Sequence, residues 1–114
     1  MSELTFSELS QFCDKLHNYF INTGEPISQK EMAYGRMVKT TEEVGELSDA
    51  VLDYFGRQRS DKDHNADNLA LEIADVIIAV SILAKAFNVN VENALHTKMT
   101  KIKNRIGENN IVSG

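Results

Sequence analysis

The sequence predicts an all-α protein with four helices, and three observations support this. Apolar residues recur at spacings of three and four along most of the 114-residue chain, without a convincing alternating run. Thr5–Glu8 and Ser28–Glu31 fit the capping-box pattern that begins a helix. A single proline and six glycines argue against a chain rich in strands and tight turns. We therefore expect a four-helix bundle-like domain over residues 1–106 and a flexible tail over 107–114.

The first two helices have recognisable ends. A helix over about 6–22 follows the first capping box, and Gly24-Glu25-Pro26 ends it. A long helix follows Ser28 and extends to about Phe55, where Gly56 is the expected residue after the helix. Gly35 and Gly45 lie inside this helix, so we expect either a close approach by a helix or ligand, or two tolerated weak points.

The second half of the chain is expected to contain a loop and two further helices. Residues 56–65 are polar and aperiodic, which indicates a surface loop. A third helix is expected over about 69–87, with Asp67 or Asn68 as its N-cap. Asn90 is positioned to cap a fourth helix over about 91–106. The apolar edge of this last helix is formed by Leu95, Met99, Ile102 and Ile106.

Composition and charge exclude several classes of protein. The formal net charge of −5 argues against binding to a nucleic-acid polymer, which relies on positive charge. Cys13 is the only cysteine, so no disulfide forms within the chain and a reducing cytoplasm is expected. The N-terminus lacks the pattern of a secretory signal. The longest apolar stretch, Val76–Ala84, is too short to span a bilayer, so no membrane association is expected.

Two pairs of acidic residues are the main candidates for chemistry. Glu72 and Asp75 lie about 60° apart on a helix that is otherwise almost entirely apolar. Burying neighbouring carboxylates is costly unless cations or donors compensate them. Glu43 and Glu46 have the same spacing on the preceding helix. Four carboxylates around one cavity suit Mg²⁺, with Mn²⁺ as a possible substitute, and no Cys/His cluster favours zinc.

Basic residues on the fourth helix provide the opposite charge. Lys98, Lys101 and Arg105 fall within about 60° of one another on its surface. Beside a metal held by carboxylates they indicate a polyphosphate ligand, although they also suit a solvated face near a helix C-terminus. The alternative expectation for Glu72 and Asp75 is that they form ion pairs with the basic residues of this helix. Lys39 is either an i,i+4 partner of Glu43 or a phosphate contact.

Three segments in order resemble the MazG-like all-α nucleoside triphosphate pyrophosphohydrolases. They are KTTEEVGELSDAVL (39–52), LEIADVIIAVSILAKAFNV (71–89) and ENALHTKMTKIKNR (92–105). The resemblance implies Mg²⁺-dependent hydrolysis of a (deoxy)nucleoside triphosphate to the monophosphate and pyrophosphate, by an oligomer built on a helical dimer. A homodimer or a homotetramer, as a dimer of dimers, is therefore expected.

The same resemblance implies roles for individual residues. The metal ligands would be Glu43, Glu46, Glu72 and Asp75, and Glu42 would orient or activate the attacking water. Phosphate contacts would come from Lys98, Lys101 and Arg105, whereas no residue is assigned to the base. A cytoplasmic role in cleaning the nucleotide pool is expected. The alternatives are a noncatalytic helical oligomerisation module and a nucleotide sensor that binds without hydrolysis.

Overall fold

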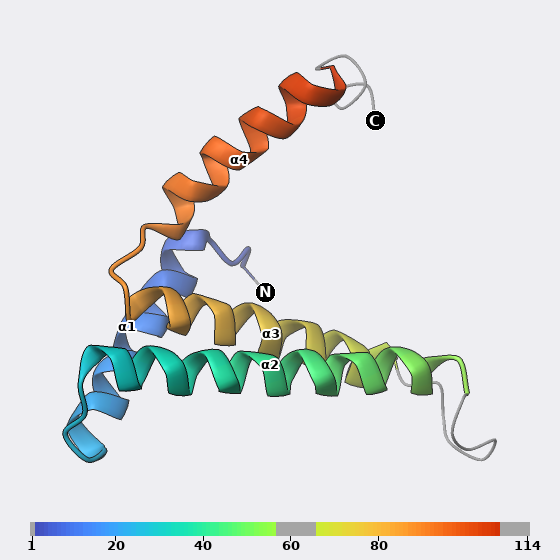
Figure 1. Ribbon diagram of the computed structural model, residues 1–114. Helices are drawn as coiled ribbons and strands as arrows, with labels where there is room; N and C mark the ends of the chain where they lie inside the picture. Colours follow the sequence, from blue (N-terminus) through green and yellow to red (C-terminus); the bar gives the residue numbers. More distant parts are fainter. Residues whose placement is uncertain (1, 57–65, 108–114) are drawn as a thin grey trace.

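A computed structural model of the chain describes residues 2–56 and 66–107. These residues form four helices and, within the described ranges, no strand (Figure 1). The helices are α1 (Phe6–Thr23), α2 (Gln29–Tyr54), α3 (Ala66–Lys85) and α4 (Val91–Ile106). The predicted all-α class is confirmed.

Side-chain caps begin three of the helices where the sequence places them. The Thr5 hydroxyl accepts from the Glu8 N–H, and the Glu8 carboxylate accepts from the Thr5 N–H in return. Ser28 and Glu31 form the same reciprocal pair before α2, and the Asn90 side chain accepts from the N–H of Asn93 before α4. Each side chain satisfies a backbone donor that has no partner within the first turn, which fixes the start of the helix.

The third helix differs from its predicted range at both ends. It begins at Ala66, so Asp67 and Asn68 lie inside the first turn instead of capping it. An aspartate there is favourable because the helix dipole is positive at this end. The helix ends at Lys85, two residues early, because Asn88 takes a left-handed conformation with φ of 55°. The Val89 N–H then donates to the Ala84 carbonyl and the Asn88 N–H to that of Lys85, as in a Schellman motif.

Two other predictions fall largely outside the described residues. Gly56, the residue expected after the second helix, has a positive φ of 74°. The rest of the expected loop lies outside the described ranges. Of the expected tail, only Gly107 is described, and its N–H donates to the Lys103 carbonyl at the end of α4.

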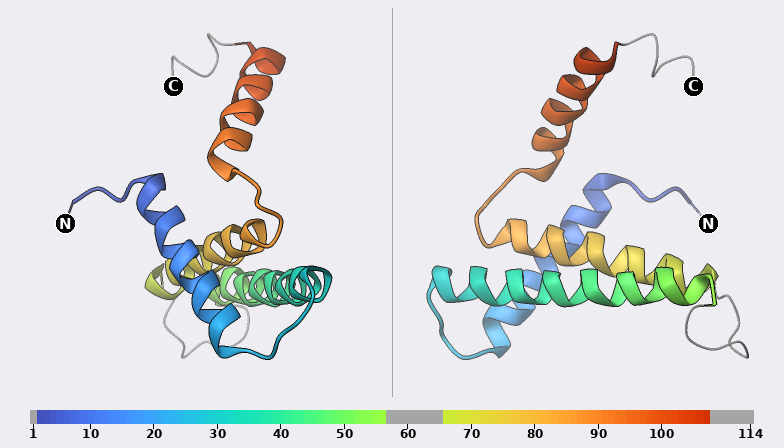
Figure 2. Two further views of the ribbon diagram at one scale, coloured as in Figure 1. Left: turned by 90° about the vertical axis from the view of Figure 1, so that its left-hand side faces the viewer. Right: turned by 45° about the vertical axis from the view of Figure 1, so that its right-hand side comes forward.

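Three helices pack together in one chain and the fourth stands apart. α2 and α3 run antiparallel along most of their length, and α1 crosses them and packs mainly on α3 (Figures 1 and 2). α4 leaves the end of α3 and extends away from this layer in all three views (Figures 1 and 2). The four predicted helices therefore do not close into a bundle within a single chain.

The core of the packed layer is small. Its buried apolar residues are Cys13, Ala33, Ala50, Ile82, Ala84 and Ala86. Cys13 is completely buried, as expected for a cysteine on the apolar stripe of the first helix. Four of these six residues are alanines, two of them in α2. Gly35 and Gly45 do not mark a close approach by another helix, because a Cβ added at either position would meet nothing within 4 Å.

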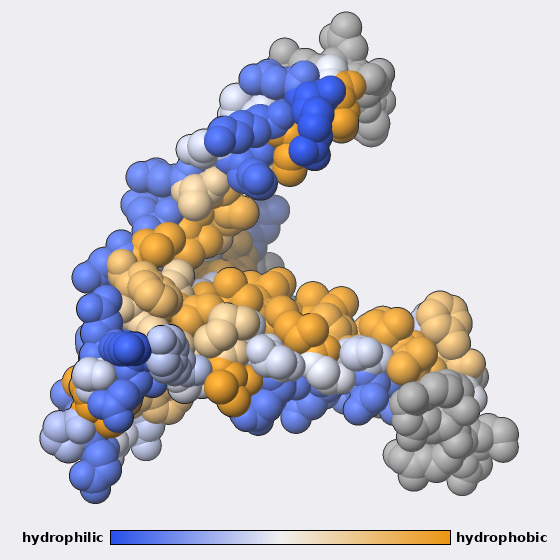
Figure 3. Space-filling view, viewed as in Figure 1, coloured by the Kyte–Doolittle hydropathy of each residue, from blue (hydrophilic) through white to orange (hydrophobic). Residues whose placement is uncertain are grey.

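Much apolar surface is left exposed by this arrangement. The predicted apolar edge of α4 is uncovered, with Leu95, Met99, Ile102 and Ile106 between 37% and 54% exposed. Figure 3 shows apolar surface along both α3 and α4. No helix in the described ranges is long and apolar enough to cross a membrane.

Candidate metal centre

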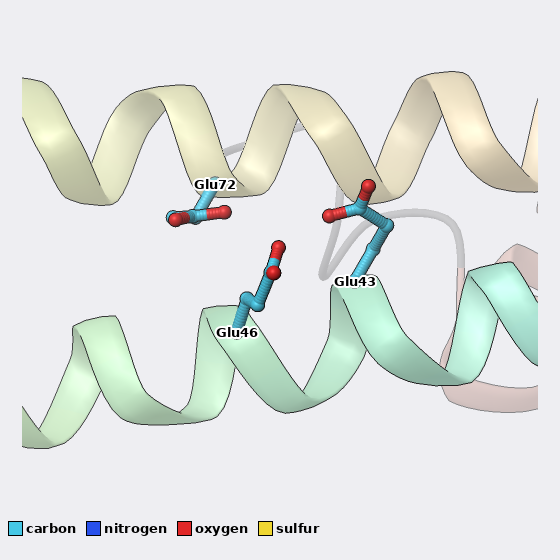
Figure 4. A group of neighbouring side chains, drawn as sticks. All are labelled: Glu43, Glu46 and Glu72. Carbon is cyan, nitrogen blue, oxygen red and sulfur yellow. The ribbon is translucent and has the colours of Figure 1, made fainter.

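Three of the predicted metal ligands meet between α2 and α3. Glu43 and Glu46 project from successive turns of α2, and Glu72 faces them from α3 (Figure 4). One carboxylate oxygen from each lies within 4.8 Å of the others. The antiparallel packing of α2 on α3 thus brings together residues that are 26 or more positions apart in the chain. We call Glu43, Glu46 and Glu72 the carboxylate cluster.

The negative charge of the carboxylate cluster is poorly compensated. A hydrogen bond with Glu43 raises the pKa of Glu46, and the charge of Glu43, desolvation and Glu72 add to this effect. The Oε1 atom of Glu72 is buried and has no hydrogen-bond partner. Among the described residues, Lys39 forms an ion pair with the cluster: its Nζ lies 3.6 Å from Glu43, but its side chain is 61% exposed, so it compensates little.

A divalent cation fits this set of donors. Ligands consisting only of carboxylate oxygens suit hard cations such as Mg²⁺ or Mn²⁺. A bound cation would give the buried Oε1 of Glu72 the partner that the protein does not provide. It would also remove the repulsion that raises the pKa of Glu46. The structure therefore provides physical support for a metal centre at this position.

The other two acidic residues of the predicted site lie beside the carboxylate cluster. Asp75 is one turn from Glu72 and lines a pocket together with Glu43 and Lys39. Glu42 points outward, with a side chain 60% exposed and a carboxylate oxygen 4.0 Å from the Lys39 Nζ. The predicted i,i+4 pair of Lys39 with Glu43 is present.

The basic residues of α4 are not brought to the carboxylate cluster within one chain. Lys98, Lys101 and Arg105 are exposed on a helix that stands away from α2 and α3 (Figure 1). In the described part of the chain, no ion pair joins α4 to Glu72 or Asp75. The alternative in which these acids pair with the basic helix is therefore not realised within a single chain.

Arg36 and His17 were not singled out from the sequence. The Arg36 Nη1 lies 2.6 Å from the His17 Nδ1 and donates to the Ile82 carbonyl at 3.1 Å. A sequence signal for Arg36 does exist. Arg36, Lys39, Glu43 and Glu46 follow one another at intervals of three, four and three residues, which places them on one face of α2. His17 has no such signal, because its contact depends on how α1 crosses the other helices.

The fold and the site together define an all-α protein with a carboxylate cluster between two antiparallel helices. Residues 35–108 match the family model described as the MazG nucleotide pyrophosphohydrolase domain. This match covers more than half of the chain, and the chain belongs to the MazG family. No curated protein and no solved structure matches it. The matched residues include the carboxylate cluster and α4 but leave out α1.

Proposed function

We propose that the protein hydrolyses (deoxy)nucleoside triphosphates to the monophosphate and pyrophosphate, using Mg²⁺ or, as a substitute, Mn²⁺. The observation that carries this proposal is the carboxylate cluster, which includes the buried and unpartnered Oε1 of Glu72. Membership of the MazG family supports the reaction class. A cytoplasmic role in removing unwanted nucleotides is part of the proposal.

Glu43, Glu46 and Glu72 would hold the cation, and Asp75 would add a fourth carboxylate from the next turn of α3. A triphosphate and these four groups carry about eight negative charges, which cannot share one cavity without metal ions. When bound, Mg²⁺ supplies charge neutralisation and a lower pKa for the attacking water.

The remaining residues of the site bind phosphate and move a proton. Glu42 is adjacent to the cation ligands and open to solvent, so it can accept a proton from the attacking water and release it to bulk. The Lys39 Nζ lies at 3.6 Å from Glu43 and 4.0 Å from Glu42. In this position it would hold a phosphate oxygen and place the α-phosphate beside Glu42.

A second copy of the chain would complete the site. The uncovered apolar edge of α4 favours burial against another copy. We propose a homodimer, alone or paired into a homotetramer, in which α4 of one copy approaches the acidic site of the other. Lys98, Lys101 and Arg105 would then contact the phosphates and stabilise the charge that develops on pyrophosphate.

A panel of NTPs and dNTPs tests the reaction directly. With Mg²⁺ the protein should release a monophosphate and pyrophosphate, which ³¹P NMR distinguishes from orthophosphate. Removing the metal with EDTA should stop the reaction, and adding back Mg²⁺ should restore it. Release of orthophosphate instead would contradict attack at the α-phosphate. Nucleotide binding without turnover would identify a sensor, and the absence of binding would favour a noncatalytic oligomerisation module.

A further inference from the structure

A pocket of about 260 Å³ lies beside the carboxylate cluster, where α1 crosses α2 and α3. Its polar end is formed by Lys39, Glu43 and Asp75. Leu16 and Phe20 of α1 and Ile78 of α3 contribute apolar side chains to its lining. Sites for drug-sized ligands usually have a volume of at least about 300 Å³. This pocket is slightly smaller, so it suits one part of a ligand.

Arg36 lies on the wall of this pocket, and no ion pair joins it to an acidic residue in the described part of the chain. Its Nη1 is occupied by the His17 Nδ1 at 2.6 Å and the Ile82 carbonyl at 3.1 Å. To accept this hydrogen bond, His17 must be neutral, and both burial and the charge of Arg36 lower the pKa of its imidazole. The Nε and Nη2 donors of Arg36 make no hydrogen bond with any described residue. The guanidinium is therefore fixed at one nitrogen and retains donors for a ligand.

We infer that the pocket binds the nucleobase of the substrate and that Arg36 selects it. This inference rests on the proposed function, because it needs the triphosphate to lie at the carboxylate cluster. The apolar wall can stack on a base while the polar end meets the sugar and phosphates. A guanidinium pairs best with two adjacent acceptors, which guanine presents as O6 and N7. Adenine places an amino group beside N7, so it offers Arg36 one acceptor and one mismatched donor.

The ratio of kcat/KM for dGTP to that for dATP is the quantity to measure. The two bases have similar size, so the ratio isolates the hydrogen-bonding difference. A bidentate contact provides about 1–3 kcal/mol of discrimination, which corresponds to about 5- to 150-fold in this ratio. Arg36→Met should reduce the ratio to near one, because it removes the donors that distinguish guanine from adenine. Lys30→Met removes a positive charge from the same helix outside this pocket and should keep the wild-type ratio.

Gly35→Leu tests the pocket independently of Arg36. Gly35 lines the pocket, and a Cβ at this position meets nothing within 4 Å, so a leucine can extend into the free space. Leucine is also the better helix former, so the melting temperature should not fall. The KM should rise at least about tenfold for every nucleotide, because the side chain occupies the base site.

The outcomes separate this inference from the proposed function. A wild-type protein that hydrolyses no triphosphate contradicts the proposed function. The base preference is then measured as the thermal stabilisation by dGTP and by dATP with Mg²⁺. An active enzyme whose dGTP/dATP ratio is unchanged in Arg36→Met contradicts the role of Arg36 alone. An unchanged KM in a folded Gly35→Leu protein contradicts the placement of the base in this pocket.

Discussion

The α2–α3 pair and α4 show opposite kinds of incompleteness. α2 and α3 pack against each other and hold a group of three carboxylates, two of them half-buried, that has little positive charge around it. α4 has basic residues in excess, and its apolar edge has no helix of the same chain to pack against. One region lacks cations, and the other lacks a surface to cover it.

This difference indicates which parts of the site a single chain provides. The cation ligands need only the packing of two helices that are joined in one chain. α4 extends away from the cluster of its own chain (Figures 1 and 2), so under our proposal the phosphate contacts and the cover for α4 would come from a second copy. The proposed dimer would relieve both deficits, because it would bring the basic residues of α4 to the carboxylates and cover the apolar edge of α4.

Removal of one cluster charge should have the largest effect. Glu46→Gln should lower kcat/KM at least about 100-fold, because it weakens the binding of the cation, which would supply several kcal/mol of charge stabilisation. Without Mg²⁺ the same variant should melt at a higher temperature than wild type, since it relieves the repulsion that raises the pKa of Glu46. Enzyme assays and calorimetry check both changes. Glu25→Gln, at an exposed position between α1 and α2, should change neither. Full activity in Glu46→Gln would show that the cluster is not the catalytic metal centre.

A charge on the apolar edge of α4 should separate the copies. Met99→Asp should give a monomer in light scattering and should lose most of the activity, because the second copy no longer covers the site. Asn104 lies on the opposite side of α4 and is exposed, so Asn104→Asp is the matched control and should remain wild-type in both measurements. An active Met99→Asp monomer would contradict a shared site.

The effect of Mg²⁺ on stability should depend on pH. The folded-state pKa of Glu46 is raised above its ordinary value of 4.5, so the metal-free protein loses stability as pH increases through that pKa. Mg²⁺ binds the ionised carboxylates and should cancel this loss. The increase in melting temperature caused by Mg²⁺ should therefore be small near pH 4.5 and grow toward pH 7. An increase that is independent of pH would mean that Mg²⁺ binds elsewhere.

Removal of helix caps should have the smallest effects. It compares the stability of the α2–α3 pair with that of α4. Ser28→Ala should reduce the free energy of unfolding by about 1 kcal/mol, because it removes the cap of α2. Asn90→Ala should cost a similar amount if α4 is docked on a second copy and unfolds together with the rest. Chemical denaturation measures both values. No change in Asn90→Ala would indicate that α4 lies free in solution.

The sequence predicted the helices well because their signals are local. Capping residues and apolar spacing act within a few positions, and so Thr5, Ser28 and Asn90 could be identified without tertiary information. The start of α3 was missed because Asp67 is acceptable both as a cap and inside a first turn.

The site was predicted only where helical spacing fixes it. Glu43 and Glu46 lie on one face of α2, and apolar surroundings identified Glu72 as partly buried. The contact between His17 and Arg36 depends on the angle at which α1 crosses α2, and no local pattern specifies that angle. The position of α4 could not be predicted either, because a helix with an apolar edge can pack on its own chain or on another copy.

Mixing two inactive variants tests the shared site most directly. One variant is Glu46→Gln, and the other is Lys98→Met/Lys101→Met/Arg105→Met. Random exchange of subunits makes about half of the dimers mixed, and each mixed dimer contains one site with intact carboxylates and intact basic residues. We predict that activity returns to roughly a quarter of the wild-type value after exchange, since half of the dimers then carry one working site of two. Mixed dimers that form, as shown by native mass spectrometry, and yet stay inactive would contradict a site built from two chains.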